Sequence, residues 1–256
     1  MDASVRQTDR VVWIADHGNY RVVKMSDTGA ILATLGGFEF VVAVSVNQNT
    51  GECWACDNDS NKVVKLAENG SLVQTCTGFS MPWDVSCYSG DGSCWVADSG
   101  NYRVVKLDAN GAELFNVSLT TESPFSVGVD ENDGSCWVGC WESVIKLAED
   151  GTILDTNTGF SMVYGVSVNP SDSSCYAVDQ TTVTKFDSAG NQLWQTGGFS
   201  QLSDVSVNEA DGSCWVSNLG TTPGGGSVYK LDANGNILLT ITGVVANASG
   251  VCVSQP

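Results

Sequence analysis

The sequence has few basic residues: 11 Lys and Arg stand against 29 Asp and Glu, and the net charge is −18. Six of the basic residues share one repeated position, which leaves five scattered along the rest of the chain. Phosphate contacts supply most of the affinity of proteins for nucleic acids, and five scattered residues cannot form a basic stripe. We therefore expect no nucleic-acid partner.

Long apolar runs are absent, and histidine is almost absent. No run approaches the ~20 residues that span a bilayer, so we expect no membrane insertion. Residues 1–4 lack the charged head and apolar core of a signal peptide. The compartment stays open, and an extracellular or cell-surface location, as an excised domain of a longer chain, is one interpretation. His17 is the only histidine; a zinc site or a catalytic triad needs several partners, so we expect His17 to be an exposed turn residue.

The chain does contain one motif repeated along its whole length, and the clearest copy is Gly-Ser-Cys-Trp-Val-Ala-Asp at residues 92–98. The large aromatic of the motif recurs every 39–42 residues, at Trp13, Trp54, Trp95, Trp137, Tyr176 and Trp215. A period of about 40 residues with one strand-forming aromatic and several Gly and Asp turns is typical of a β-propeller blade. We therefore predict an all-β chain, a six-bladed β-propeller that forms one domain over residues 1–256.

Each repeat contains four short β-rich segments separated by Gly, Asp and Asn turns, which predict four antiparallel strands per blade. In the third repeat, strands A to D span residues 83–87, 94–97, 103–107 and 113–117. Strand B is apolar on both faces, as in a sheet buried between two neighbours. The repeats run approximately over residues 2–42, 43–83, 84–125, 126–164, 165–203 and 204–250, with a surplus strand A at 250–254.

Ring closure is over-specified, because both ends of the chain carry a strand A, at residues 2–5 and 250–253. We expect the C-terminal strand to complete the first blade, so that the ring closes by mixing N- and C-terminal strands in one blade. Val251 and Val253 bury more apolar area than Ala3 and Val5, and the N-terminal segment would then fray or lie outside. A chain cut from a longer repeat array is the second explanation.

The chain contains ten cysteines, and five of them occupy the position just before the repeat aromatic: Cys53, Cys94, Cys136, Cys175 and Cys214. Equivalent positions in packed sheets lie ~10 Å apart, too far for a disulfide, which needs Cα atoms within ~7 Å. The first repeat has Val12 at this position, so these cysteines are predicted to be small core hydrophobes. One pair is placed for a disulfide: Cys87 on strand A should face Cys94 on strand B.

Six lysines share a position on strand C: Lys24, Lys65, Lys106, Lys146, Lys185 and Lys230. Each stands beside an acidic turn, as Lys106 does near Asp108. We expect paired, solvated salt bridges here and not a cationic ring.

The stretch from Trp95 to Lys106 resembles the NHL-repeat family of β-propellers, with an aromatic-Val-Ala-Asp strand end, a Gly-Asn turn and an Arg before strand C. The first repeat matches it from Trp13 to Lys24, whereas the other repeats depart from it at the turn. The resemblance implies a structural role for the Asp, Asn and Arg of that turn: Asp16, Asn19, Arg21, Asp98, Asn101 and Arg103. The family includes protein-binding and RNA-binding modules and a few lyases, so the resemblance selects no single function.

The B–C and D–A loops lie at one end of the predicted propeller and are rich in aromatic residues. Function tends to sit on variable loops held by a rigid scaffold, so this end is the candidate binding face. The candidate ligand-binding residues are Tyr20, Asp59, Trp83, Tyr102, Trp141 and Tyr164. We expect a non-catalytic scaffold, a monomer, that binds a protein or a glycan. A repeat protein with no evolved ligand is a further interpretation.

An enzyme is the alternative. Lyases and lactonases on six-bladed propellers bind a metal at the channel mouth, and the matching positions here are the starts of the A strands. Only Asp84 and Asp204 are acidic among them, which is a weak constellation that could hold calcium, an oxygen-seeking ion. This interpretation makes the protein a metal-dependent lyase or hydrolase.

Overall fold

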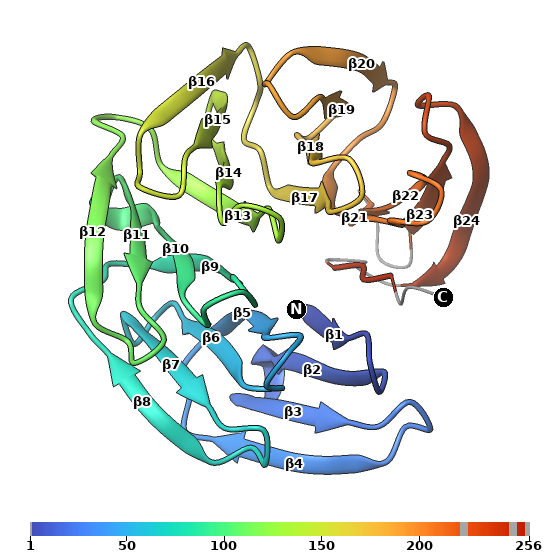
Figure 1. The fold of residues 1–256 in the computed structure, drawn as a ribbon. Helices are drawn as coiled ribbons and strands as arrows, with labels where there is room; N and C mark the ends of the chain where they lie inside the picture. The colour runs from blue at the N-terminus through green and yellow to red at the C-terminus, as the bar shows by residue number, and fades with distance from the viewer. Residues whose placement is uncertain (1, 221–224, 246–249, 254–256) are drawn as a thin grey trace.

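The computed structural model describes residues 2–220, 225–245 and 250–253. In that part of the chain 24 strands form six four-stranded antiparallel sheets, which stand as blades in a ring (Figure 1). The only helical segments there are two single-turn 3-10 helices, η1 (His17–Asn19) and η2 (Ser99–Asn101). The predicted six-bladed β-propeller is confirmed. No helix among the described residues is long and apolar enough to cross a membrane.

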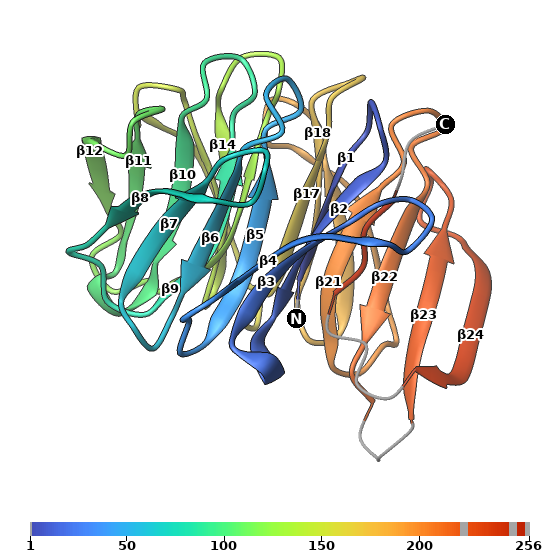
Figure 2. The same ribbon diagram turned by 90° about the horizontal axis from the view of Figure 1, so that it is seen from below.

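Each blade consists of four strands that are consecutive in the chain, with strand A innermost and strand D outermost (Figure 1). Blade by blade, the strands are β1 (Ala3–Arg6), β2 (Val11–Asp16), β3 (Arg21–Met25) and β4 (Ile31–Gly36); β5 (Val41–Val46), β6 (Cys53–Asp57), β7 (Lys62–Leu66) and β8 (Leu72–Cys76); β9 (Pro82–Cys87), β10 (Cys94–Asp98), β11 (Arg103–Leu107) and β12 (Glu113–Ser118); β13 (Pro124–Val129), β14 (Cys136–Cys140), β15 (Ser143–Leu147) and β16 (Ile153–Thr158); β17 (Gly165–Asn169), β18 (Ser174–Val178), β19 (Thr182–Phe186) and β20 (Gln192–Gly197); β21 (Leu202–Val207), β22 (Cys214–Asn218), β23 (Gly226–Leu231) and β24 (Ile237–Val245). Figure 2 shows the ring from the side, with the loops gathered at its two ends.

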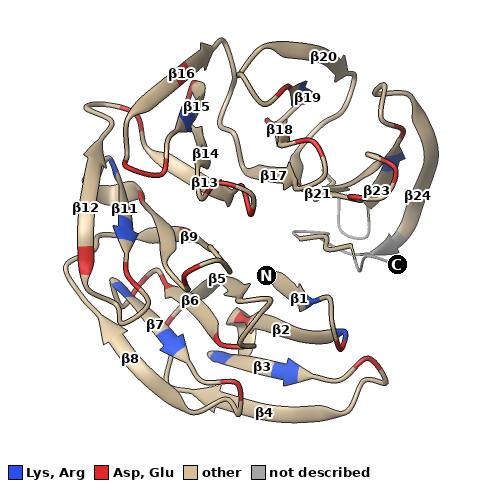
Figure 3. Ribbon diagram, in the orientation of Figure 1, with Lys and Arg blue, Asp and Glu red and all other residues tan. Residues whose placement is uncertain are grey.

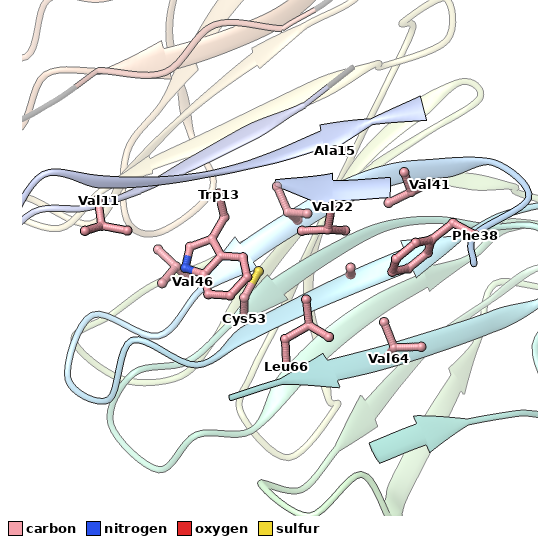
Figure 4. Close-up of a cluster of buried hydrophobic side chains, with 12 residues drawn as sticks. Val11, Trp13, Ala15, Val22, Phe38, Val41, Val46, Cys53, Val64 and Leu66 are labelled. Atoms are coloured by element: carbon pink, nitrogen blue, oxygen red, sulfur yellow. The ribbon is translucent and has the colours of Figure 1, made fainter. Parts of the chain in front are cut away.

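The core lies between the blades. Trp13 of blade 1 packs against Val46, Cys53 and Leu66 of blade 2 (Figure 4). The five cysteines at the Cys53 position are free and buried, as predicted. Both faces of strand B therefore contribute to packing, one against the blade before and one against the blade after.

The strand-C lysines are bound differently from the prediction, because five of them are buried: Lys24, Lys65, Lys106, Lys146 and Lys185. The ammonium of each lies 4.8–5.5 Å from the ring centroid of the strand-B aromatic in its own blade. Figure 3 shows a blue basic segment in the third strand of each blade, including β23 of blade 6, which carries the sixth lysine, Lys230. Lys65, Lys106 and Lys185 also form ion pairs, at 2.9, 3.4 and 3.7 Å. The expected ion pairs are thus present in part, but the expectation of solvated side chains was wrong.

The same ammonium groups reach the next blade. Lys65 Nζ donates to the carbonyl of Ala109 at 2.8 Å, and Lys106 Nζ donates to the carbonyl of Glu149 at 3.1 Å. Lys24 and Lys146 donate in the same way to Glu68 and Ser188. All four acceptors lie in the C–D turn of the following blade. We call this arrangement of aromatic ring, lysine and turn carbonyl the clamp; it joins one blade to the next.

The prediction for ring closure was wrong. The N-terminal strand β1 pairs with β2, and among the described residues no blade mixes strands from the two chain ends. The reason lies in hydrogen bonds that a comparison of apolar area ignores. Asp2 Oδ2 and Ser4 Oγ accept two backbone N–H groups of β5, at 2.9 and 3.0 Å. Gly250 and Cys252 hold the same repeat positions and have no side-chain oxygen that could accept these bonds.

Cys87 and Cys94 are opposite each other in the β9–β10 pairing, as the sequence predicts. Both are buried free thiols in the structure. Burial raises the pKa of the Cys87 thiol to about 12, which keeps it protonated and unreactive at neutral pH. The disulfide stays a prediction.

The turn residues have the structural role that the NHL resemblance implies. The carboxylate of Asp98 accepts hydrogen bonds from Asn101 Nδ2 at 2.9 Å, Arg103 Nε at 2.7 Å and the backbone N–H of Ser80 at 2.7 Å. Asp16 binds Asn19 and Arg21 in the same way. One carboxylate thus holds a B–C loop to the D–A loop that enters its own blade.

Replacing Lys106 by Met tests the clamp. The Lys106→Met variant keeps the apolar stem but loses the cation over Trp95 and the bond to the Glu149 carbonyl, so we expect a loss of about 1–3 kcal/mol in the free energy of unfolding. Urea denaturation measures it. Lys230→Met is the matched control, because Lys230 lies over Trp215 at 5.7 Å but, within the described residues, has no turn carbonyl to reach. Equal losses in both variants would contradict the clamp.

Candidate functional site

The axis of the ring contains a cavity of about 530 Å³, whose lining reaches from His17 and Phe40, at the end carrying the B–C and D–A loops, to Gln7 and Gln48 in the A–B turns. The inner strands line its wall, and the wall includes the carboxyls of Asp2, Asp84 and Asp204. Five aromatic side chains line it as well: His17, Phe40, Trp83, Phe125 and Tyr164. The cavity therefore joins an acidic wall to an aromatic mouth.

The aromatic rings converge on Phe125. Its ring centroid lies 6.2 Å from that of Trp83, 5.8 Å from that of Trp141 and 6.4 Å from that of Tyr164. These four residues, which we call the aromatic cluster, come from blades 3, 4 and 5. Trp83 and Trp141 are 37% and 49% exposed. A cluster packed on one side and open on the other can stack on a ligand without rearranging.

Backbone hydrogen bonds hold the loops that carry the cluster. The N–H of Trp141 donates to the carbonyl of Ser123 at 3.1 Å, and the N–H of Tyr164 donates to the carbonyl of Val178 at 3.0 Å. The B–C loop of blade 4 is only two residues long, so Trp141 has little freedom to move away. These contacts preorganise the cluster.

The structure brings together three of the six predicted ligand-binding residues: Trp83, Trp141 and Tyr164. It does not bring the other three to them. Tyr20 and Tyr102 end η1 and η2 in the left-handed conformation, with φ of 57° and 54°, and are 60% and 46% exposed. Asp59 is exposed on the B–C loop of blade 2.

The predicted ligand-binding residues did not include the central member of the cluster, Phe125. A signal was available: Trp83, Phe125 and Tyr164 hold one repeat position, directly before the first channel residue of strand A. Blades 2 and 6 have Val42 and Ser203 there. His17 also departs from expectation, because it is partly buried at the cavity mouth, 5.3 Å from the Phe40 ring.

The channel carboxyls tie neighbouring blades together. Asp84 accepts the N–H groups of Val85 and Val127, each at 2.8 Å. Asp204 accepts those of Val205 and Val251, each at 2.8 Å. Asp2 and Asp84 thus make the same bond from one strand A to the next, and the carboxyls are structural parts of the ring.

Desolvation, with Asp2 as the next largest cause, raises the pKa of Asp84 to about 7. The same two causes raise the pKa of Asp204 well above its ordinary value. Burial also raises the pKa of Asp2. Carboxyls in one channel favour the neutral form in each other, since like charges at close range oppose ionisation.

The donor set fits a metal poorly. Among the described residues, no three His, Cys, Asp or Glu side chains lie close enough together to hold one. Asp84 and Asp204 face the channel as predicted, but their oxygens already accept backbone N–H groups. Calcium takes six to eight oxygen ligands, more than these two carboxyls provide. Calcium in the channel stays a prediction, which metal analysis of the protein can check.

No family model matches the chain, and no curated protein matches it. Solved structures do resemble it. Hydrazine synthase of Kuenenia stuttgartiensis superimposes with a TM-score of 0.83 at 11% identity, over 99% of this chain and 89% of that one. Virginiamycin B lyase from Staphylococcus aureus superimposes with a TM-score of 0.81 at 15% identity, over 100% of this chain and 88% of that one. At these identities the likeness concerns the fold, and it supports a β-propeller and no particular chemistry.

The raised pKa of Asp84 makes stability depend on pH. Between its unfolded value of 3.8 and its folded value of about 7, the folded protein keeps a proton that the unfolded chain releases, so this contribution is lost as pH rises through that window. Asp84→Asn cannot ionise. We expect the variant to lose less stability than the wild type between about pH 4 and about pH 8, by about 2–4 kcal/mol. Urea denaturation across that range measures the difference; parallel curves would contradict it.

Proposed function

We propose that this protein is a non-catalytic binding module, which presents the aromatic cluster and the channel mouth to a protein or glycan ligand. The observation that carries the proposal is the convergence of Trp83, Trp141 and Tyr164 on Phe125. All of these except Trp141 also line the cavity. Elsewhere on the same end of the ring, the exposed rings Tyr20 and Tyr102 make no ring contact with another described aromatic residue.

The cluster has the physical properties of a binding anchor. Aromatic rings bury a large area and lose little side-chain entropy, which makes Trp and Tyr frequent hot spots. Their faces stack on sugar rings or on apolar side chains, and a cation is attracted to them as well. The channel below the cluster contains the carboxyls of Asp84 and Asp204, which can form further hydrogen bonds with hydroxyl groups of a ligand.

Substituting Trp141 tests the proposal once arrays of glycans and peptides have identified a ligand for the wild type. Trp141→Ala removes one exposed ring, and we expect it to weaken binding by about 2 kcal/mol, roughly thirtyfold. Titration calorimetry measures the affinity.

Tyr102→Ala is the matched control, because Tyr102 has a similar exposure, 46% against 49%, outside the cluster. It should bind as the wild type does. Equal affinity of the two variants for the ligand would contradict the proposal. So would the absence of any glycan or peptide on the arrays that binds the wild type.

A metal-dependent lyase or hydrolase is the second candidate, and one observation favours it. A carboxyl whose pKa is about 7, as for Asp84, suits general acid–base catalysis at neutral pH. Elemental analysis and melting curves with EDTA and with added calcium separate the two candidates. A stoichiometric metal whose removal lowers the melting temperature would place the enzyme first, and a metal-free protein that is indifferent to both treatments would support the binding module.

A further inference from the structure

The ring is not uniform, because blade 6 and blade 1 do not pack as other neighbours do. From blade 1 to blade 6, each strand A packs closely against the next, as β17 does against β21, but β21 has no such contact with β1. Figure 1 shows the C-terminal segment lying between these two blades. We call the facing surfaces of blades 6 and 1 the seam.

On the blade 6 side, side chains that are buried elsewhere are partly exposed. Trp215 and Val228 are only partly buried, whereas Trp54 and Val63, at the same repeat positions in blade 2, are 0% exposed. Leu239 of the outer strand is 45% exposed. This face is therefore an apolar blade surface without a full cover.

The blade 1 side has the same property. Val12 and Ile14 are partly buried, whereas Cys53 and Ala55, at the same positions in blade 2, are 0% exposed. Both walls of the seam are thus the faces that other blades use to pack against a neighbour.

Residues 250–253 occupy the place of one more strand A beside blade 6. The N–H of Val251 donates to Asp204 Oδ2 at 2.8 Å, and the N–H of Val253 donates to Ser206 Oγ at 3.1 Å. The same two bonds join blade 3 to blade 4, where Asp84 and Ser86 accept at 2.8 and 3.0 Å. The segment is docked as strand A of a blade.

This strand A has no strand B within the described residues, since no strand there pairs with 250–253. Successive backbone groups of a strand point to opposite edges, so the N–H and C=O of Cys252 face the unpaired edge. Cys252 is also the one exposed cysteine of the ten, all of which are described. An unpaired edge is a template for strand addition.

The clamp of blade 6 is incomplete in the same direction. Lys230 lies over Trp215 at 5.7 Å, and its ammonium, unlike those of blades 1 to 4, has no bond to a turn carbonyl in the described part of the chain. Lys185 of blade 5 lacks that bond too, but it pairs with Asp172 at 3.7 Å. A neighbour that filled the seam would have to supply that carbonyl as well as strand B.

We propose that the seam is a docking site for a β-hairpin of another polypeptide, whose two strands are apolar on both faces and which carries a polar turn. One strand pairs with the free edge of 250–253, and its faces fill the space between Trp215 and Ile14. The turn that follows the second strand offers a carbonyl to Lys230. Strands B and C of this chain's own repeat have this pattern: β10 and β11 are buried on both faces, with Arg103 as the one partly buried exception.

The test uses a synthetic peptide with the sequence of residues 92–111, which spans β10, β11 and the following turn, and which carries Cys94→Val to remove its thiol. Cross-strand partners lie on the same face, so the Trp95 of the peptide would cover the Cys252 thiol. We expect maleimide labelling of Cys252 in the intact protein to slow about tenfold at a peptide concentration ten times the dissociation constant. Fluorescence anisotropy of labelled peptide gives that constant.

The control peptide adds Ala97→Pro, which removes a backbone donor from the pairing edge, and it should leave labelling unchanged. A protein truncated after residue 249 should not bind the hairpin. An isolated hairpin is marginally stable, so a second measurement appends the same sequence to the C-terminus through a Gly-Ser linker, which raises the effective concentration. This fusion should melt above the matching Ala97→Pro fusion.

Three results would overturn the proposal. The first is the absence of both peptide protection and added stability in the fusion. The second is slow labelling of Cys252 in the free monomer, which would mean that the chain closes its own seam. The third is a concentration-dependent dimer with a protected Cys252, which would mean that a second copy fills it.

Discussion

The clamp between successive blades is the interaction on which the rest of this structure depends. A blade is a small sheet with two apolar faces, and it is stable only between neighbours that cover both. The strand-B aromatic buries apolar area between two blades. The lysine above it orients one blade on the next, since its ammonium meets both the ring and a carbonyl of the next turn. A buried ammonium without such partners would be costly. The aromatic and the lysine recur in every repeat, and in blades 1 to 4 the lysine also meets a carbonyl of the next turn.

The regular clamp explains where function can lie. Residues that serve it recur in every blade and carry no information about a ligand, whereas departures from the repeat are free to specialise. Two such departures stand out. Blades 3, 4 and 5 have Trp83, Phe125 and Tyr164 where blades 2 and 6 have Val42 and Ser203, and these rings form the mouth of the channel. At the seam, the repeat itself is interrupted, and the described residues cover the facing blade surfaces only in part.

The sequence predicted the fold well because a propeller blade is a local unit: four strands, their turns and the buried aromatic all lie within about 40 residues. It predicted poorly what depends on contacts between repeats. Lys106 looked like a solvated surface residue because its acidic neighbour is close in sequence, whereas its carbonyl partner, Glu149, is 43 residues away. The strand that closes the ring was predicted from apolar area alone. The hydrogen bonds that decide it, from Asp2 and Ser4 to β5, join residues 42 positions apart. Three members of the aromatic cluster, Trp83, Trp141 and Tyr164, were predicted from their loop positions. The fourth, Phe125, was missed, although it shares a repeat position with Trp83 and Tyr164.

The aspartates of the channel hold neighbouring blades together and also line the cavity of the candidate site. Asp84 and Asp204 look like metal ligands when the first channel positions are compared, yet each accepts a backbone N–H of the next strand A. Inner-edge amides have no strand partner, and a buried amide without an acceptor destabilises the fold. Aspartate at this position satisfies that amide, and it does so at the wall of a cavity where desolvation raises its pKa. The acidity of the channel is therefore a consequence of how the blades are joined, and a ligand at the aromatic mouth meets carboxyls that are already held in place.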